Sequence, residues 1–284
     1  MGIIFDQVSY SYPDGPGLVD VDFHVKKGTM LAVLGAPGSG KSTLLQHMNG
    51  LLLPARGSVQ IDSLRIEAAC KRRVLADVRK RVGLIFQYPE QQLFEETVEQ
   101  DLCFGPVNFG ASEEEAAAAA RRAAQWVGLE EAFLSRSPAQ LSSGERRRAA
   151  IASVLASEPD IVALDEPTAS LDAAGRADLM SCLARMCREE GKTVIVATHR
   201  IEDVAPYAQD YIVLQAGRLL FQGDGNELLR RPDVLEAAGV TVPAAARIGR
   251  QLSELLELVD QGLRPDPAVL AGAIQEAMER RGVR

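Results

Sequence analysis

The segment from Met30 to Thr43 reads M-L-A-V-L-G-A-P-G-S-G-K-S-T, and it decides the fold of this chain. Its first five residues predict a short buried strand, after which the pattern G-x-x-x-x-G-K-[ST] leads into a helical stretch. Glycines allow such a loop to curl so that its N–H groups and the helix N-terminus face a polyphosphate. The sequence therefore predicts a phosphate-binding loop formed by Gly35, Pro37, Gly38, Ser39, Gly40, Lys41, Ser42 and Thr43.

A pair of carboxylates downstream complements this loop. The apolar run Ile161–Leu164 predicts a second buried strand, and it ends in Asp165 and Glu166. A parallel strand that delivers Asp beside a phosphate loop is what a Mg²⁺ site requires, with Ser42 as a further ligand. Lys41 would place its charge at the β- and γ-phosphates, and Glu166 is free to act as general base toward water.

The rest of the chain predicts a parallel α/β core with additions. Apolar strands at 82–86, 161–164 and 193–198 alternate with helical stretches at 141–157 and 173–189, which is typical of crossover helices on a parallel sheet. Alternating patterns at 3–9 and 18–25 predict an antiparallel β subdomain. A helical subdomain is expected at about 90–160, with a helix at 113–127 capped by Ser112 and Glu115 and with Trp126 in its core.

A C-terminal appendage is expected after this core. The sequence divides into a large domain at 1–235 and a helical segment at 236–284, where apolar residues recur at helical spacing. We expect this segment to pack across a dimer, with docking on its own chain as the alternative. The apolar stripes of its two helices are Leu252, Leu255 and Val259, and Leu270, Ile274 and Met278.

Composition excludes several classes of protein. The net charge of −8 does not favour a nucleic-acid partner. Four cysteines without CxxC spacing fit a reduced compartment better than a disulfide framework or a zinc site. No apolar run reaches the roughly 18 residues of a membrane-spanning helix. Contact with a membrane is therefore expected through a partner.

Five further segments resemble the ATP-binding cassette ATPase family, in the family's order and at similar spacing over about residues 1–230. Gln87 follows a strand as the family's Q-loop glutamine does, and His199 resembles the switch histidine. Leu141–Glu145 resembles the signature motif, and Ser170–Asp172 resembles the D-loop. Tyr12 stands where the adenine-stacking aromatic is expected, with Tyr10 as a neighbouring candidate.

The resemblance implies a P-loop (RecA-like) fold and an ATPase that works as a head-to-tail dimer. Each ATP would lie between one chain's phosphate loop and the other chain's signature residues Ser142, Ser143 and Gly144, with Asp172 close by. Glu166 would polarise the attacking water, and His199 and Lys41 would stabilise charge on the γ-phosphoryl group. Gln87 would join Ser42 and Asp165 around Mg²⁺. Ser143 departs from the glycine usual at its position. Its hydroxymethyl group would either crowd the neighbour's ATP, and so slow the site that this signature completes, or point away from it.

A narrower resemblance follows Gln87. Residues 88–110, Y-P-E-Q-Q-L-F-E-E-T-V-E-Q-D-L-C-F-G-P-V-N-F-G, are similar to the ATPases of energy-coupling factor transporters, which import vitamins and cobalt or nickel in prokaryotes. This implies a peripheral subunit at the cytoplasmic face of the membrane, bound to a transmembrane coupling subunit and a substrate-binding membrane subunit. The second ATPase would be a different chain, with a homodimer as the alternative.

The other function considered is a soluble cassette ATPase that acts on nucleic acid or the ribosome. Repair ATPases of this kind carry long coiled-coil insertions, and translation factors usually carry two cassettes; neither feature is present.

Within the narrower resemblance, Leu93 and Phe94 stand beside Pro89 and Glu90. Bulky apolar groups next to polar ones predict a groove for a short partner helix, with seating of the helical subdomain on the core as the alternative.

Overall fold

The structure is a computed structural model, which describes residues 2–169 and 171–244 and the single positions 247, 272 and 275. The apolar stripes predicted at 252–259 and 270–278 lie outside the described residues. Within the described part, no helix is long and apolar enough to cross a membrane.

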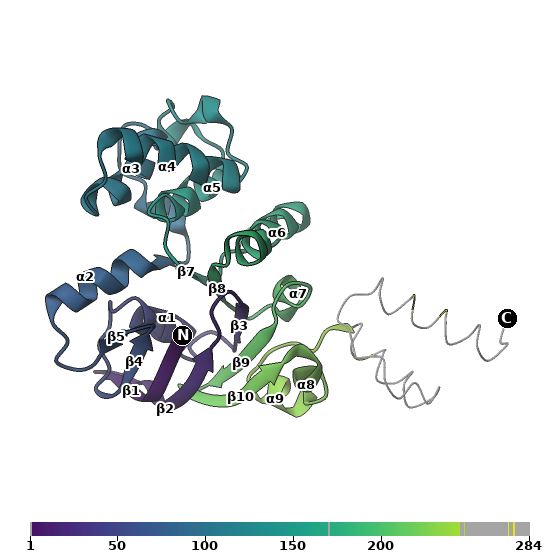
Figure 1. Cartoon of the computed structure of the whole chain (residues 1–284). Helices are drawn as coiled ribbons and strands as arrows, with labels where there is room; N and C mark the ends of the chain where they lie inside the picture. Colours follow the sequence, from purple (N-terminus) through teal and green to yellow (C-terminus); the bar gives the residue numbers. More distant parts are fainter. Residues whose placement is uncertain (1, 170, 245–246, 248–271, 273–274, 276–284) are drawn as a thin grey trace.

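A six-stranded sheet forms the centre of the molecule (Figure 1). Its strands are β3 (Met30–Leu34), β6 (Val82–Ile85), β7 (Ile161–Asp165), β8 (Thr193–Thr198), β9 (Asp210–Gln215) and β10 (Arg218–Asp224). Their order is β10-β9-β3-β8-β7-β6; all neighbours are parallel except β10, which pairs antiparallel with β9 at the edge. The parallel core predicted from the sequence is therefore confirmed.

Both faces of this sheet are buried, which explains the apolar runs. In β3, Met30, Ala32 and Leu34 belong to one hydrophobic core, whereas Leu31 and Val33 belong to the other. A strand covered on both faces needs apolar residues at every position, so it reads as a continuous run rather than an alternation. The phosphate loop and the two carboxylates follow β3 and β7, and parallel strands bring such segments to the same edge.

An antiparallel sheet covers one face of the central sheet. Its order is β2-β1-β4-β5, and its strands are β1 (Ile3–Tyr12), β2 (Gly15–Val25), β4 (Arg56–Ile61) and β5 (Leu64–Ile66). The helix α1 (Lys41–Met48) shares one hydrophobic core with both sheets, where it contributes Leu44, Leu45 and Met48. One further helix, α2 (Arg72–Arg81), precedes β6, and the basic clusters 71–73 and 79–81 lie at its two ends.

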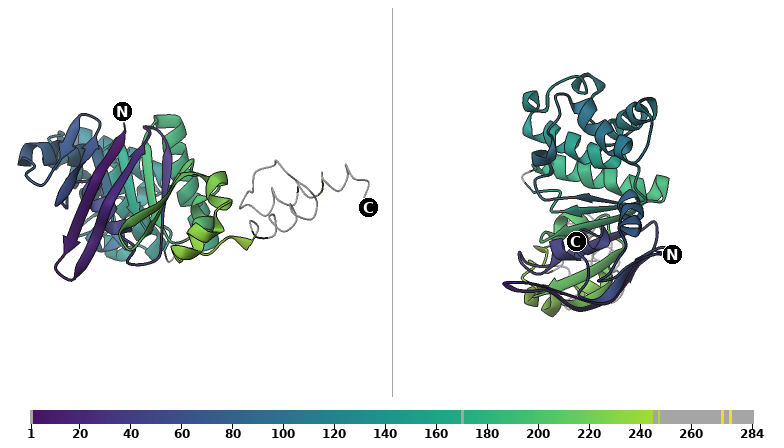
Figure 2. Two further views of the ribbon diagram at one scale, coloured as in Figure 1. Left: turned by 90° about the horizontal axis from the view of Figure 1, so that it is seen from below. Right: turned by 90° about the vertical axis from the view of Figure 1, so that its left-hand side faces the viewer.

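A helical layer lies on the opposite face (Figure 2). It consists of α3 (Val98–Asn108), α4 (Glu113–Trp126) and α5 (Ser143–Leu155), which pack on one another, with the short helices η1 (Pro89–Gln92), η2 (Glu131–Phe133) and η3 (Pro138–Gln140) between them. The helix α6 (Ala173–Glu190) lies between this layer and the sheet in Figure 1. The remaining helices, α7 (Ile201–Val204), α8 (Gly225–Leu229) and α9 (Pro232–Ala237), accompany β9 and β10.

Local signals set several helix starts. The predicted cap of α4 is confirmed: the Ser112 hydroxyl accepts a hydrogen bond from the Glu115 N–H, and the Glu115 carboxylate accepts one from the Ser112 N–H. The same reciprocal cap opens α5 at Ser142 and Glu145, so this helix is shorter than the predicted 141–157. The sequence analysis did not predict α3, whose buried Pro106 near its C-terminal end resembles a helix breaker.

Candidate active site

The phosphate loop joins β3 to α1, and its backbone needs glycine. Gly40 has φ +105°, and a Cβ atom there would come within 2.8 Å of the Gly17 carbonyl oxygen. Lys41 begins the helix and is 6% exposed. Its Nζ donates hydrogen bonds to the carbonyl oxygens of Gly35 (2.8 Å) and Ala36 (3.1 Å). The loop therefore holds the ammonium group close to its own backbone, at the start of α1.

The carboxylate of Glu166 is held by three neighbours. Thr198 Oγ1 donates to Glu166 Oε2 at 3.0 Å, and His199 Nδ1 lies 2.9 Å from Oε1. Lys41 Nζ lies 3.7 Å from the same Oε1. The backbone of Glu166 has φ +47° and its N–H donates to the Ala197 carbonyl at 2.8 Å, so β8 supports this strained residue. With this left-handed backbone conformation, the Glu166 side chain points toward Thr198 and His199, at the end of β8.

Burial sets the charge balance of the site. The pKa of the Asp165 carboxyl is raised by burial, against the lowering influence of a hydrogen bond from Ser42. The pKa of the Lys41 ammonium is lowered by burial, which the nearby Glu166 and Asp165 oppose. Burial therefore disfavours both the Asp165 carboxylate and the Lys41 ammonium in the chain alone. Such shifts are typical of groups at functional sites.

One cavity of about 450 Å³ collects most of the predicted site residues. Residues from separate segments meet on its wall: the loop, the start of α1, the end of β7 and the residues after β6 and β8. The predicted members are Tyr12, Pro37, Gly38, Gly40, Lys41, Ser42, Thr43, Gln87, Asp165, Glu166 and His199. Gly35 and Ser39 support the loop without lining this cavity.

Three residues of the wall were not predicted. Pro16 and Gly17 belong to β2, and Ala169 follows the two carboxylates in the chain. Pro16 and Gly17 lie between the two strands predicted at 3–9 and 18–25, and nothing in their sequence indicates proximity to the loop at Gly40. The contact depends on how the antiparallel sheet packs on the core, which the local sequence does not encode.

Tyr12 has the position expected of a residue at the rim. It is 40% exposed, its hydroxyl lies 3.2 Å from Thr43 Oγ1, and its ring packs edge-on against Tyr10 with centroids 5.0 Å apart. Tyr10 in turn contacts the ring of His47, on α1, with centroids 5.1 Å apart. Only Tyr12 of the two tyrosines lines the cavity. The geometry therefore favours Tyr12 over Tyr10 as the aromatic group that faces a ligand.

The signature residues lie elsewhere. Ser142 and Ser143 are exposed at the N-terminus of α5, in the helical layer, and none of the residues 142–144 lines the nucleotide cavity of their own chain. Asp172 is used as the cap of α6, where its Oδ1 accepts from the Gly175 N–H at 2.8 Å. Ser170 is outside the described residues. The predicted site is thus divided between one cavity and two exposed helix starts.

The cavity has donors suited to Mg²⁺. No group of three or more His, Cys, Asp or Glu side chains in the described part of the chain could hold a metal. The cavity instead offers the Asp165 carboxylate, the Ser42 hydroxyl and the Gln87 amide. Mg²⁺ prefers oxygen ligands and commonly takes one or two carboxylates together with substrate phosphates. The donor set therefore fits a Mg²⁺ ion that arrives with a nucleotide.

Comparisons with known proteins agree with this site. Residues 18–169 match the family model described as ABC transporter. The chain is 47% identical over 259 residues to the energy-coupling factor transporter ATP-binding protein EcfA2 of Bacillus thuringiensis (strain Al Hakam), across 89% of this chain and 88% of that protein. The EcfA2 protein of Listeria welshimeri is 45% identical over 252 residues, across 87% of this chain and 88% of that protein.

Solved structures show the same fold. That of cbiO1 from Clostridium perfringens, described as part of the ABC transporter complex cbiONQ, has a TM-score of 0.74 and 34% identity, covering 87% of this chain and 98% of that one. The dimeric ATP-binding cassette MJ0796 bound to ADP and Pi has a TM-score of 0.71 and 30% identity, covering 78% of this chain and 98% of that one. The chain therefore belongs to the ABC transporter family of ATPases, among the ATP-binding proteins of energy-coupling factor transporters.

Proposed function

We propose that this chain is the ATP-hydrolysing subunit of an energy-coupling factor importer, which drives uptake of a vitamin or a transition-metal ion through membrane subunits. The observation that carries this proposal is the convergence of the phosphate loop, Asp165, Glu166, Gln87 and His199 on one cavity. The likeness to EcfA2 proteins over most of the chain supports the transporter assignment. The alternative of action on nucleic acid has no support from the net charge of −8.

The residues of the cavity divide the chemistry of hydrolysis among them. Glu166 accepts a proton from the attacking water, and Thr198 and His199 fix the orientation of its carboxylate. Lys41 and His199 stabilise the negative charge that develops on the γ-phosphoryl group. Ser42, Asp165 and Gln87 hold Mg²⁺, which neutralises phosphate charge when bound. Tyr12 stacks on the adenine, and the backbone N–H groups of the loop from Gly38 to Thr43 donate to the phosphates.

The second half of each site comes from another chain. Ser142 and Ser143 are exposed and Gly144 is partly buried. None of the three lines the nucleotide cavity of its own chain, so they are free to complete the cavity of a neighbour in a head-to-tail dimer. The related cassette MJ0796 is described as dimeric in a post-hydrolysis state. A heterodimer with a second ATPase is favoured for this chain, and a homodimer has the same geometry. Asp172 would lie at the same contact, beside the cap of α6.

We assign the predicted groove for the membrane partner to a cavity of about 480 Å³ that lies next to the end of β6 and has Phe94 on its wall. Phe94 is 64% exposed and packs edge-on against Phe104, which is 49% exposed, with centroids 5.0 Å apart. Leu51 and Phe86, which also line this cavity, add exposed apolar surface to it. Leu93 instead packs partly buried against the core. Leu93 and Phe94 were both expected in the groove, but only Phe94 has the exposure that a docking residue needs.

The segment 236–284 remains assigned to dimerisation by its sequence pattern. Most of it lies outside the described residues. We retain the proposal that it keeps the subunits together without nucleotide, and that the assembly sits at the cytoplasmic face of the membrane.

The function is tested by purifying the tagged chain from detergent-solubilised membranes and identifying the proteins that accompany it. We expect a second cassette ATPase, or this chain alone as a dimer, together with two kinds of membrane protein. The purified assembly, reconstituted in vesicles, should take up its substrate only with ATP. Recovery of ribosomes or nucleic acid, and no membrane protein, would refute the transporter assignment.

A further inference from the structure

A second cavity, of about 400 Å³, lies between the helical layer and α6. Its walls are the C-terminal end of α4, one face of α5 and one face of α6. None of its residues also lines the nucleotide cavity or the groove at Phe94. Of its wall residues, the proposed function uses Gly144 of the signature, but it assigns no role to the arginines or to Trp126.

Positive charge dominates this cavity. Its charged wall residues are Arg147, Arg148, Arg185 and Asp178. Arg147 is paired with Glu90 outside the cavity at 3.4 Å, but neither Arg148 nor Arg185 has an ion-pair partner among the described residues. The nitrogens Arg147 Nη2 and Arg148 Nε are buried and have no hydrogen-bond partner within the described chain. A buried donor without a partner is costly, so these groups favour an acceptor from outside.

The remaining wall suits an apolar body. The Arg185 guanidinium carbon lies 5.2 Å from the centroid of the Trp126 ring. The apolar side chains of Leu171, Leu179 and Ile151 also line the cavity. The Cys182 thiol, also on this wall, donates to the Trp126 carbonyl oxygen at 2.8 Å, which fixes the end of α4 against α6. Trp126 was expected in the core, but it is only partly buried and lines this cavity.

We propose that this cavity binds a small organic oxyanion, a phosphate or a carboxylate attached to an aromatic or apolar body. The guanidinium groups of Arg148 and Arg185 receive the anionic group, and Trp126 packs on the body. Arginine offers several donors in a planar fork that matches both oxyanions. The volume is within the range of small-molecule sites, and a few polar groups in an apolar wall are typical of them.

Such a ligand would bridge two parts of the chain. Arg148 belongs to the helix that begins with the signature, whereas Arg185 belongs to α6, which packs on β8. An anion held by both arginines ties the helical layer to the sheet. The site is therefore placed to restrain movement of the signature relative to the phosphate loop of the same chain.

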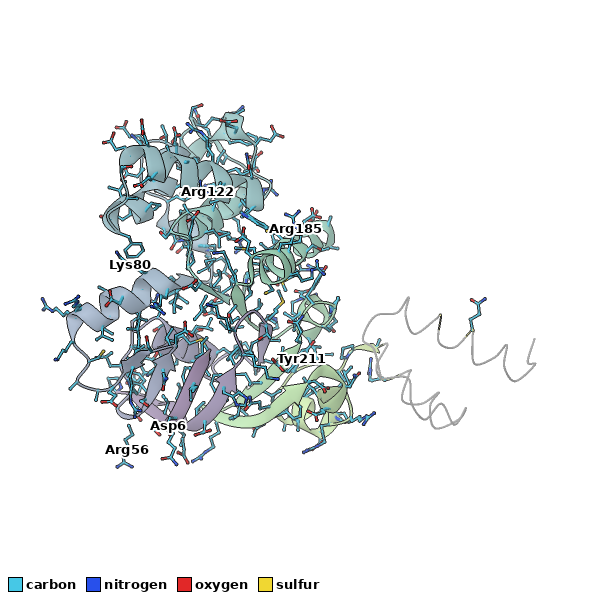
Figure 3. The ribbon with its side chains drawn as sticks, in the orientation of Figure 1. Asp6, Arg56, Lys80, Arg122, Arg185 and Tyr211 are labelled. Atoms are coloured by element: carbon cyan, nitrogen blue, oxygen red, sulfur yellow. The ribbon has the colours of Figure 1, made fainter. Side chains whose placement is uncertain are left out.

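The chain contains a single tryptophan, so one label reports on this cavity alone. We would incorporate 5-fluorotryptophan and follow its single ¹⁹F resonance in the full-length protein. Phenyl phosphate and phenylacetate are the two anionic probes, and benzyl alcohol is the neutral probe of similar size. Arg148→Gln and Arg185→Gln are the test variants. Arg122→Gln is the control, because Arg122 lies on α4 but pairs with Glu158 outside the cavity (Figure 3).

We expect a saturable shift with at least one anion and little shift with benzyl alcohol. Each test variant should weaken binding about tenfold, the effect of losing one charge-assisted hydrogen bond, and Arg122→Gln should not. The anion that binds identifies the chemical group. Arg185 is exposed, so Arg185→Gln should stay folded even if Arg148→Gln does not. The same shift should persist in Lys41→Ala, which removes phosphate binding at the nucleotide loop.

Three results would overturn the proposal. An equal response to benzyl alcohol would show that the cavity binds the apolar body and does not recognise the anionic group. An affinity for the anion that is unchanged in Arg185→Gln, or no shift with either anion, would exclude an arginine-bound oxyanion. A shift that disappears in Lys41→Ala would place the probe in the nucleotide cavity.

Discussion

Arg147 Nε lies 3.4 Å from Glu90 Oε2, so the helix that begins with the signature is tied to the segment that follows Gln87. The Arg147 side chain is 4% exposed and that of Glu90 is 29% exposed. A second contact runs parallel, from Gln92 Nε2 to the Ala150 carbonyl oxygen at 3.4 Å. The chain leaving the nucleotide cavity and the residues offered to the neighbouring chain are therefore mechanically connected.

The first prediction concerns this pair. Glu90→Gln should lower the free energy of unfolding by about 1 kcal/mol, because the buried Arg147 guanidinium loses its counter-charge. The effect is modest because the Glu90 carboxylate is partly exposed to water. Arg147→Gln should cost a similar amount, and the double variant should cost less than the sum of the two. Urea unfolding of all four proteins measures the coupling. Additivity within about 0.3 kcal/mol would show that the contact contributes nothing.

The second prediction concerns the general base. Glu166→Gln preserves the side-chain shape and its neighbours Thr198 and His199, but it cannot accept a proton. ATP turnover of the assembled complex should fall by about 10²-fold or more. Nucleotide binding should persist, and size-exclusion chromatography with ATP should show a stable dimer. Near-normal phosphate release from this variant would remove Glu166 from its proposed role.

The third prediction separates the fold from the dimer contact at Gly144. A Cβ atom at this position would meet nothing within 4 Å in its own chain, so Gly144→Ala should melt at the same temperature or slightly higher. If Gly144 faces the neighbour's ATP, the added methyl group should nevertheless reduce hydrolysis at least several-fold. ATP binding by the isolated chain is the control and should not change. Full activity in the assembled variant would place the neighbour's nucleotide away from Gly144.

The fourth prediction follows from the raised pKa of Asp165. The folded chain binds this proton more readily than the unfolded chain, so stability falls as pH rises from the ordinary value of 3.8 through the raised folded-state pKa. At pH 7 the charged carboxylate is therefore a cost, and Asp165→Asn should raise the melting temperature by about 2 °C or more without nucleotide or metal.

This gain should shrink as the pH is lowered toward the ordinary value, and stabilisation by Mg²⁺ with ATP should be lost. Thermal melts in EDTA from pH 5 to 8 test the pH dependence, and melts with Mg²⁺ and ATP but without EDTA test the loss of stabilisation by the ligand. Asp77→Asn, at an exposed position of α2, is the matched control and should have little effect at any pH. A lower melting temperature for Asp165→Asn at pH 7 would contradict the argument.

The fifth prediction concerns the groove. Phe94→Glu should leave thermal stability and ATP binding intact, because the side chain is 64% exposed. It should abolish co-purification with the membrane subunits or uncouple ATP hydrolysis from uptake. Leu220→Glu is the control: Leu220 is 39% exposed on β10, away from this groove. Normal assembly and transport by the Phe94 variant would locate the docking surface elsewhere.

Much of the fold could be predicted from local signals. Strands such as β3 and β7 are apolar on both faces, and the cap at Ser112 marks a helix start that could be predicted from the sequence. The equivalent cap at Ser142 was not predicted. The helix α3 was missed because Gly105-Pro106 resembles a break, although tertiary packing holds it. The strands β9 and β10 were missed as well, because no strand was predicted after residue 198.

The site was easier to predict than its surroundings. Motif spacing identified the residues of the nucleotide cavity except Pro16, Gly17 and Ala169, which reach it through tertiary packing. The division of Leu93 from Phe94 also required the structure, because adjacent residues differ in burial only once α3 and its neighbours are placed. The cavity at Trp126 has no motif, since it is formed by helices α4, α5 and α6 from distant parts of the sequence.

The separation of Ser142 from the nucleotide cavity of its own chain has a genetic consequence. In a head-to-tail homodimer, a chain damaged at Lys41 still offers an intact signature, and a chain damaged at Gly144 still offers an intact phosphate loop. Each allele alone is inactive, but a mixed pair contains one site assembled from the two undamaged halves. Two defective alleles would therefore complement each other in the same cell. In a heterodimer with a different ATPase, the same two alleles would remain defective together.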